Sequence, residues 1–338
     1  MEVLVATLVD VARMAGVSVS TVSHVVNGTR PVNDATRQRV EEAIAAVDYR
    51  QDTVARALRR SRTDSVGLVV SDVSQPVFGE MVRGFEQEAT AAGLTVLLAN
   101  SGENAVHESR AVRTLTDRRV DGLVVAPVAH SLLAELEAIS QRGTPVVVMD
   151  RLGSTNIDQV GVYNTEPTTD LVLHMVEHGH RRIGLVAGDL SVATMFERHL
   201  GYQKALSEAG IDYDPALVVT GSGMAEQTSL DMRDLLASAG RPTAVIAAST
   251  ETAAGALRAA YALGMQCPTD FAFASFDGFA YPDLFRPTLT AVTQPARQVG
   301  ATALKLLLSR LNGPDPGPFV TVRLHPSVDY RQSCGCQS

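Results

Sequence analysis

From about residue 65 onward, short runs of apolar residues alternate with segments of helical periodicity. The apolar runs are 66–70, 94–99, 122–127, 145–150, 182–188, 216–220, 244–249 and 271–277, with helical stretches around 85–92 and 109–115. Fully apolar strands separated by helices are typical of parallel sheets that carry helices on both faces. These strands are too many for one comfortable sheet, and the pattern breaks near Asn164–Pro167. The sequence therefore predicts an α/β fold with two doubly wound lobes and a ligand cleft at the carboxyl ends of their strands.

Residues 7–48 follow a different pattern, which predicts three short helices. Capping residues mark the helix ends: Thr7 and Gly16, Ser18 and Asn27-Gly28, and Asn33 or Asp34 at the start of the third. A fourth short amphipathic segment, 53–60, opens at Asp52 and precedes the polar stretch SRTDS.

These changes of pattern divide the chain. We expect an all-α domain over 1–51, a linking helix over 52–65 and a larger domain over 66–338. Within the larger domain, the first lobe is expected over about 66–164 and 291–322, and the second over about 165–290 and 323–338. One further strand-like run, VTVRLHP, lies at 320–326.

Composition and charge narrow the class of protein. The 338 residues are 45% hydrophobic and 20% charged, which suits a globular chain that needs no disulfides or metals to fold. The three cysteines form no disulfide framework, the start of the chain lacks a secretory signal, and no apolar run is long enough to cross a membrane. We therefore expect a cytoplasmic protein.

The net charge of −8 is distributed unevenly. Residues 1–62 hold nine arginines against seven acids, and five of those arginines fall between positions 50 and 62. An acidic body with a locally basic end is compatible with DNA binding through that end alone.

The segment DVARMAGVSVSTVSHVVNG, 10–28, has the pattern of a helix-turn-helix, whose second helix enters the major groove of DNA. From its exposed face, the side chains expected to meet base edges are Val19, Ser20, Ser23 and His24, and those placed for phosphates are Thr21 and Asn27. The alternative from the pattern alone is a generic three-helix bundle.

Several longer segments of the sequence are similar to a known protein family. They are TLVDVARMAGVSVSTVSHVVNG, VNDATRQRVEEAIAAVDYRQDTVARALR, GFEQEATAAG, VDGLVV, EHGHRRIGLVAG, ERHLGYQKAL and SFDGF. Through them the whole chain resembles the lactose-repressor/galactose-repressor (LacI/GalR) family of transcriptional regulators, whose two sensor lobes resemble periplasmic binding proteins.

The resemblance implies a repressor that binds a palindromic operator in double-stranded DNA as a homodimer. The segment 52–60 would be a hinge helix, with Leu58 wedged into the central base step and Ala55 beside it in the minor groove. The residues expected to contact DNA are Thr7, Ser18, Val19, Ser20, Thr21, Ser23, His24, Asn27, Thr36, Ala55, Leu58 and Arg59. The alternative for the hinge is a solvated linker helix. His24 stands where the family usually has arginine, so the operator should differ at the base pair it faces.

The resemblance also implies a small-molecule effector between the lobes. The matching residues are Phe78, Asp150, Thr194, Arg198, Ser249, Asp277 and Gln294. Carboxylates that accept paired hydroxyls, a forked guanidinium and an aromatic ring suit a sugar or a related polar metabolite. Ser249-Thr250 and Tyr163-Asn164 depart from the family pattern of Asn-Asp and Asp-Asn. Three alternatives to a sugar therefore remain: a bulkier effector, an effector with fewer hydroxyl groups, or no effector.

Other chemistry has less support. His174, His178 and His180 have a spacing that would hold zinc on a helix, but the resemblance places them at a helix end, where they cap carbonyls. Cys334 and Cys336 are expected on a free tail, so no metal or cofactor is predicted. No catalytic or nucleotide-binding motif is present, which argues against an enzyme. A solute-binding protein and a protein-interaction module are the rivals. No heptad pattern follows Leu311, so we expect dimers rather than tetramers.

Overall fold

The computed structural model describes residues 6–28, 30–49, 62–128, 132–313 and 317–336. The chain consists of two units, Met1–Thr63 and Asp64–Ser338. No helix among the described residues is both long and apolar enough to cross a bilayer.

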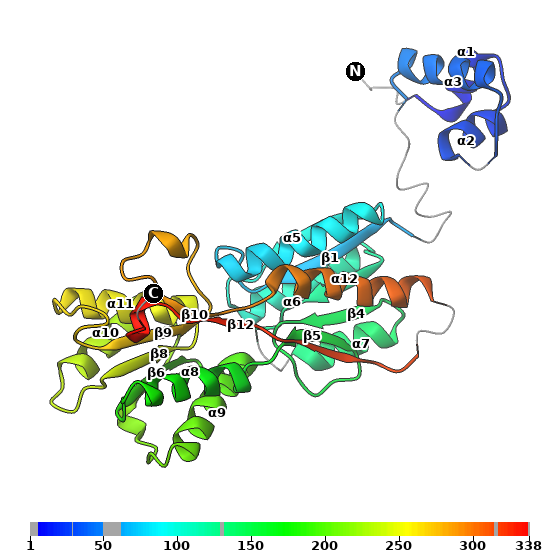
Figure 1. Cartoon of the computed structure of the whole chain (residues 1–338). Coiled ribbons are helices and arrows are strands. Elements are labelled where there is room, and N and C mark those ends of the chain that lie inside the picture. The colour runs from blue at the N-terminus through cyan, green and yellow to red at the C-terminus, as the bar shows by residue number, and fades with distance from the viewer. Residues whose placement is uncertain (1–5, 29, 50–61, 129–131, 314–316, 337–338) are drawn as a thin grey trace. The chain divides into compact units, whose positions relative to one another are not determined.

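The first unit is a bundle of three helices, as the sequence predicts (Figure 1). They are α1 (Leu8–Ala15), α2 (Val19–Asn27) and α3 (Asp34–Ala46). The first two helices end at Gly16 and Gly28, whose φ angles of 65° and 62° lie in the left-handed region that favours glycine. Val11, Val22 and Val40 are fully buried and form the centre of a small core.

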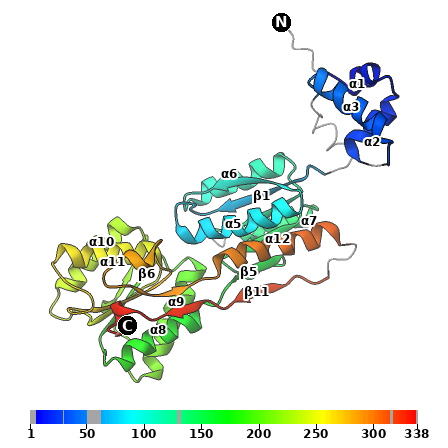
Figure 2. The same ribbon diagram turned by 45° about the horizontal axis from the view of Figure 1, so that its top comes forward.

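The first lobe of the larger unit is a six-stranded parallel sheet in the order β11-β5-β4-β3-β1-β2. Its strands are β1 (Ser65–Val70), β2 (Thr95–Asn100), β3 (Gly122–Val125), β4 (Val146–Met149), β5 (Asp158–Val162) and β11 (Thr321–Leu324). Its helices are α5 (Pro76–Ala91), α6 (Ala105–Asp117), α7 (Leu133–Gln141) and α12 (Ala296–Asn312). Both views show α5 and α12 side by side (Figures 1 and 2).

The second lobe repeats this plan with the strand order β12-β10-β9-β8-β6-β7, and only β12 is antiparallel to its neighbour. Its strands are β6 (Ile183–Gly188), β7 (Val218–Thr220), β8 (Ala244–Ala247), β9 (Ala272–Phe276), β10 (Thr290–Thr293) and β12 (Ser327–Asp329). Its helices are α8 (Thr165–Glu177), α9 (Ala193–Glu208), α10 (Ala225–Ala237) and α11 (Thr250–Ala262).

The lobe boundaries differ slightly from those expected from the sequence. β10 belongs to the second sheet, so the chain returns to the first lobe after Thr293 rather than before residue 291. β11 belongs to the first sheet through Leu324, so the last crossing follows that residue rather than residue 322. The first bound was too early because β10 was not among the apolar runs, and the second was too early because it was placed inside the expected strand 320–326.

The prediction of a free tail at Cys334 and Cys336 is wrong. Residues Gln332–Cys334 form a 3-10 turn, in which Ser333 and Cys334 are buried. The Ser333 hydroxyl donates a hydrogen bond to the Phe273 carbonyl at 2.7 Å and accepts one from the Thr290 N–H at 2.8 Å. These bonds attach the turn to β9 and β10, which are close to it in space but not in sequence.

Candidate functional site

Polar side chains gather at the exposed start of α2. Ser18, Val19 and Ser20 are exposed, and the Ser18 hydroxyl accepts a hydrogen bond from the Thr21 N–H at 3.1 Å. The Ser18 Oγ also lies 2.8 Å from the Oγ atoms of Ser20 and Thr21. A helix N-terminus with exposed hydroxyls has the donors and the partial positive charge that phosphate oxygens need.

The rest of this surface follows helical spacing along α2. Ser23, His24 and Asn27 are half-exposed, and the Asn27 amide donates to the Ser23 carbonyl at 2.7 Å. Thr7 caps α1, where its hydroxyl donates to the Asp10 carboxylate at 2.7 Å. Thr36 lies half-exposed in the first turn of α3. The expected hinge contacts, Ala55, Leu58 and Arg59, lie outside the described residues.

In the larger unit, two carboxylates end central strands of different lobes. Asp150 follows β4, Asp277 follows β9, and both have positive φ angles, 69° and 65°. Such a backbone is uncommon for a residue with a side chain, and aspartate tolerates it better than most. Both residues are buried: Asp277 lines a cavity between α5 of the first lobe and the second lobe, and Asp150 lies close enough to Asp277 to interact with it electrostatically.

Arg198 of α9 lies beside these two carboxylates and is only 2% exposed. Its Nε donates to the Asn164 Oδ1 at 2.9 Å, and its Nη1 donates to the Ala248 carbonyl at 2.6 Å. The same Nη1 lies 3.6 Å from the Asp277 Oδ2, and the guanidinium carbon lies 3.5 Å from the centroid of the Phe276 ring. Together these contacts fix the plane of the guanidinium.

Burial dominates the electrostatics of this cluster. It raises the pKa of Asp150 to about 6, although Arg151 and Arg198 oppose the shift. Burial also raises the pKa of Asp277, against the influence of Arg198 and the hydrogen bond from Gln294. The pKa of Arg198 is lowered by its own burial, which Asp277 and Asp150 partly offset. A ligand that hydrogen-bonds these groups would replace the water that they have lost.

Gln294 links the cluster to a cavity of about 350 Å³. Its Nε2 donates to the Asp277 Oδ1 at 2.7 Å, while its buried Oε1 has no hydrogen-bond partner among the described residues. The cavity has Val77 of α5 on one side and Phe279 and Phe285 of the second lobe on the other. Its size suits a small metabolite.

Of the expected effector residues, Asp277 and Gln294 line the cavity, and the others do not. Phe78 is 2% exposed and packs in the hydrophobic core, so the aromatic wall of the cavity comes from Phe279 and Phe285 instead. Ser249 caps α11, and its hydroxyl accepts from the Thr252 N–H at 3.2 Å. Thr194 is buried at the start of α9.

The sequence interpretation missed a pair of charges beside Asp150. Arg151 donates to both carboxylate oxygens of Glu103, at 2.6 and 2.8 Å, and its Nε lies 3.8 Å from the Asp150 Oδ2. Its position directly after Asp150 at a strand end was the available signal.

The sequence interpretation also missed a hydrogen-bond network next to Arg198. Glu197 accepts from the Asn164 amide at 2.7 Å and from Arg323 at 2.7 and 3.1 Å. Asn164 therefore bonds to Arg198 through its oxygen and to Glu197 through its nitrogen. This network joins β11 of the first lobe to helices α8 and α9 of the second.

Comparison with known proteins agrees with both parts of this architecture. Residues 7–52 match the model of bacterial regulatory proteins of the lacI family, and residues 172–334 match a periplasmic binding protein-like domain. The HTH-type transcriptional repressor PurR of Aliivibrio salmonicida is 34% identical over 97% of this chain and 98% of its own length. The ribose operon repressor of Haemophilus influenzae is 33% identical over 97% and 98%.

Solved structures give the same result. A lac repressor dimer bound to operator and the anti-inducer ONPF has a TM-score of 0.87 and 27% identity, covering 98% of this chain and 99% of its own. The transcriptional regulator CelR in complex with cellobiose has a TM-score of 0.73 and 30% identity, covering 97% and 99%. With a helix-turn-helix unit, two periplasmic-binding-protein-like lobes and similarity along nearly its whole length to named repressors, the chain belongs to the lacI family of bacterial regulatory proteins.

Proposed function

We propose that this protein is a sequence-specific transcriptional repressor that binds a palindromic operator as a homodimer and is controlled by a small molecule held between its lobes. The observation that carries the proposal is Arg198, buried between Asn164 and Asp277 where the two lobes meet, in a chain that also has a lacI-type DNA-binding domain. Such a protein is a regulator rather than an enzyme, and it acts in the cytoplasm, where the DNA is.

DNA recognition would use the exposed face of α2 in the major groove, with Ser18, Val19 and Ser20 at its leading end. Two copies of the chain would place two such helices on the half-sites of a palindrome. From the family resemblance, Leu58 would enter the minor groove at the centre of the site, with Ala55 beside it and Arg59 on phosphates.

The effector would be a sugar or a related polar metabolite. The carboxylates of Asp150 and Asp277 would accept hydrogen bonds from its hydroxyl groups, and the Gln294 Oε1, which has no partner among the described residues, would accept one more. The cellobiose complex of CelR and the similarity to a ribose operon repressor support this class of ligand.

The DNA half of the proposal is tested by selecting bound sequences from a random DNA pool at two salt concentrations. We expect a short palindrome with a flexible pyrimidine–purine step at its centre. Affinity for it should fall at least roughly a hundredfold between about 50 and 200 mM salt, because bound phosphates release counterions. Recovery of no motif, with binding insensitive to salt, would favour a protein-interaction module instead.

The effector half is tested by screening sugars and related metabolites for a rise in Tm. Arg198→Ala and Gln294→Ala should each abolish the rise produced by the best ligand and leave basal DNA affinity unchanged. Arg310→Ala is the matched control, because it removes another buried ion pair, with Asp158 at 2.6 Å in the first lobe, away from the cleft. Arg310→Ala should lower the Tm of the free protein and keep the rise in Tm that the ligand produces. A normal response in Arg198→Ala would remove this residue from the site.

A further inference from the structure

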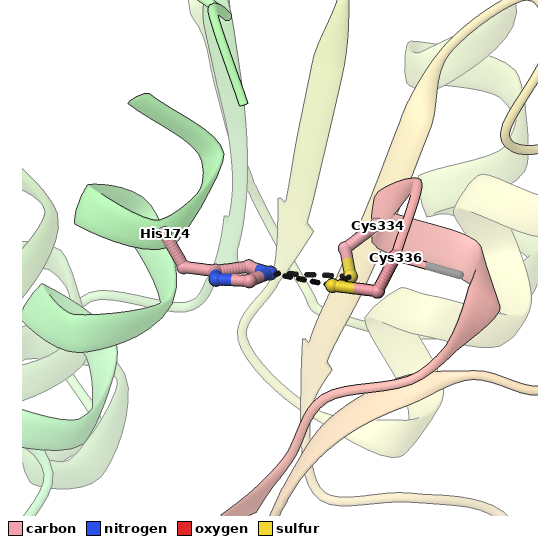
Figure 3. A group of neighbouring side chains, drawn as sticks. All are labelled: His174, Cys334 and Cys336. Atoms are coloured by element: carbon pink, nitrogen blue, oxygen red, sulfur yellow. Dashed lines mark hydrogen bonds between the residues drawn. The ribbon is translucent and has the colours of Figure 1, made fainter. Parts of the chain in front are cut away.

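Two motifs that lie far apart in the sequence meet in the second lobe. His174 projects from α8 toward the sulfur atoms of Cys334 and Cys336, which come from the turn after β12 (Figure 3). The His174 Nε2 lies 3.2 Å from the Cys334 Sγ and 3.4 Å from the Cys336 Sγ. The two sulfur atoms lie 3.2 Å from each other, so three donor atoms face a common point.

The fold prepares this arrangement. The hydrogen bonds of Ser333 to β9 and β10 hold the turn in place, and Cys334 is only 1% exposed. Gly335 then adopts a φ angle of 95°, which a residue with a side chain would resist, and so turns Cys336 back beside Cys334. The two thiols are therefore positioned by the backbone rather than by chance contacts of a flexible end.

His178 offers a fourth donor one helical turn after His174. Its Nδ1 lies 3.0 Å from the His174 carbonyl oxygen, and since a carbonyl can only accept, this nitrogen carries the hydrogen. The lone pair is then on Nε2, which lies 3.5 Å from the Cys336 Sγ. A histidine whose other nitrogen donates to a backbone carbonyl is the usual form of a metal-ligating imidazole.

We propose that His174, His178, Cys334 and Cys336 bind a Zn²⁺ ion that fastens the C-terminal turn to α8. Two thiolates and two imidazoles are a common tetrahedral ligand set for structural zinc. Two thiolates also balance the charge of the ion, so the site is neutral overall and suits the partly buried position of the cluster. With four protein ligands the site is closed, and its role is structural rather than catalytic.

The main alternative is a pair of redox-active thiols. The sulfur atoms are 3.2 Å apart, beyond the bonding distance of about 2.05 Å in a disulfide. A redox pair also needs an accessible thiol, which only the half-exposed Cys336 offers, because Cys334 is buried. One imidazole beside a thiol would be enough to activate it, whereas here the nitrogens of two histidines face the two sulfur atoms and complete the four donors of a zinc site. The donor set therefore favours a metal.

The test uses the full-length, reduced protein, titrated with Co²⁺ as a spectroscopic substitute for Zn²⁺. We expect one equivalent to bind with the ligand-field bands of a tetrahedral site and a thiolate-to-cobalt charge-transfer band, and Zn²⁺ to displace it. Zn²⁺ at about a hundredfold excess over its Kd should raise the Tm by roughly 5 °C or more.

Variants identify the ligands. Cys336→Ser and His178→Gln should each weaken Zn²⁺ binding by about a hundredfold or more, and His178 is exposed, so its replacement leaves the fold intact. The matched controls are Cys267→Ser and His180→Gln, which change a cysteine and a histidine outside the cluster. Cys267 contacts the Ser333 carbonyl at 3.2 Å, and His180 contacts the Thr243 hydroxyl at 2.9 Å. Both controls should bind Zn²⁺ as the unaltered protein does.

Three results would overturn the proposal. One is the absence of a thiolate-to-cobalt band in the reduced protein. Another is Zn²⁺ affinity that Cys336→Ser and His178→Gln leave unchanged. The third is binding of Cu⁺ through the two thiolates alone, with no binding of Zn²⁺ or Co²⁺.

Discussion

Glu108 of α6 is a carboxyl with no exposed surface, and it has a structural rather than a ligand-binding environment. Its Oε1 accepts from the Val128 N–H at 2.7 Å, and its Oε2 has no hydrogen-bond partner among the described residues. Burial raises its pKa from the ordinary 4.5 to about 7, although the Val128 hydrogen bond and Arg151 oppose the shift. The folded protein therefore holds this proton more tightly than the unfolded chain does.

This shift has a defined effect on stability. An acid with a raised pKa in the folded state contributes stability below its unfolded pKa and loses it as pH rises through the folded pKa. The free energy of unfolding should therefore fall between about pH 4.5 and pH 7, by up to roughly 3 kcal/mol from Glu108. Glu108→Gln keeps the acceptor for Val128 and should remove this share of the slope in denaturant titrations at several pH values.

Glu137→Gln is the control for that slope, because its pKa is shifted the other way. Hydrogen bonds from the Thr155 hydroxyl and the Asn156 N–H lower the pKa of Glu137. Its stabilising contribution is present at neutral pH and is lost as pH falls, so the variant should be less stable than the unaltered protein at pH 7. A Glu108→Gln protein with the full original slope would show that Glu108 does not titrate in this range.

At the scale of elements, capping residues and apolar strands could be predicted because their signals are local. Three strands, β5, β10 and β12, were missed. β5, DQVGV, begins with two polar residues that are both buried: Arg310 donates to Asp158 at 2.6 and 2.8 Å, and Gln159 bonds to the backbone of Gly153. Since Arg310 is 152 positions away from Asp158, no local pattern announces that this carboxylate has a partner.

The pairing of α5 with α12 depends on two glycines. A Cβ atom on Gly84 would overlap the Arg297 carbonyl, and one on Gly300 would overlap the Met81 carbonyl. Gly84→Ala should therefore lower the free energy of unfolding by about 2 kcal/mol or more, because the backbones of the two helices would have to separate. Denaturant unfolding of the purified variant measures the change.

Gly79→Ala is the matched control on the same helix. Apart from the neighbouring backbone of α5 itself, no atom of the described residues lies within 4 Å of the position its Cβ would take, so the substitution should stabilise α5 by roughly 0.5–1 kcal/mol. Equal effects of the two variants would mean that helix propensity, and not the close approach to α12, decides the stability at Gly84.

At the scale of the whole molecule, the sequence could name candidate residues of the cleft, but it could not show which contacts form between distant segments of the chain. The family resemblance named Asp150, Asp277 and Arg198 as effector residues, and the first two also end strands. The burial of Phe78 and the approach of Cys334 to His174, 160 positions earlier, depend on packing between distant segments. Nothing in the sequence indicated that the C-terminal turn is held in place, because the hydrogen bonds that fix Ser333 come from strands more than 40 residues before it.

The proposed control of DNA binding by a ligand predicts a coupling that can be measured either as a change in operator affinity or as a change in ligand affinity. If a ligand in the cleft changes the affinity of the Met1–Thr63 unit for operator DNA by some factor, the operator must change the affinity for the ligand by the same factor, since the four states form a closed cycle. We expect a factor of about 5 to 150, as is typical of allosteric coupling. Calorimetric titration of the best ligand, with and without saturating operator, measures it, and DNA of shuffled sequence is the control. Equal ligand affinity in the presence of operator and of shuffled DNA would show that the two units work independently, and it would contradict control by an effector even if both binding activities were found.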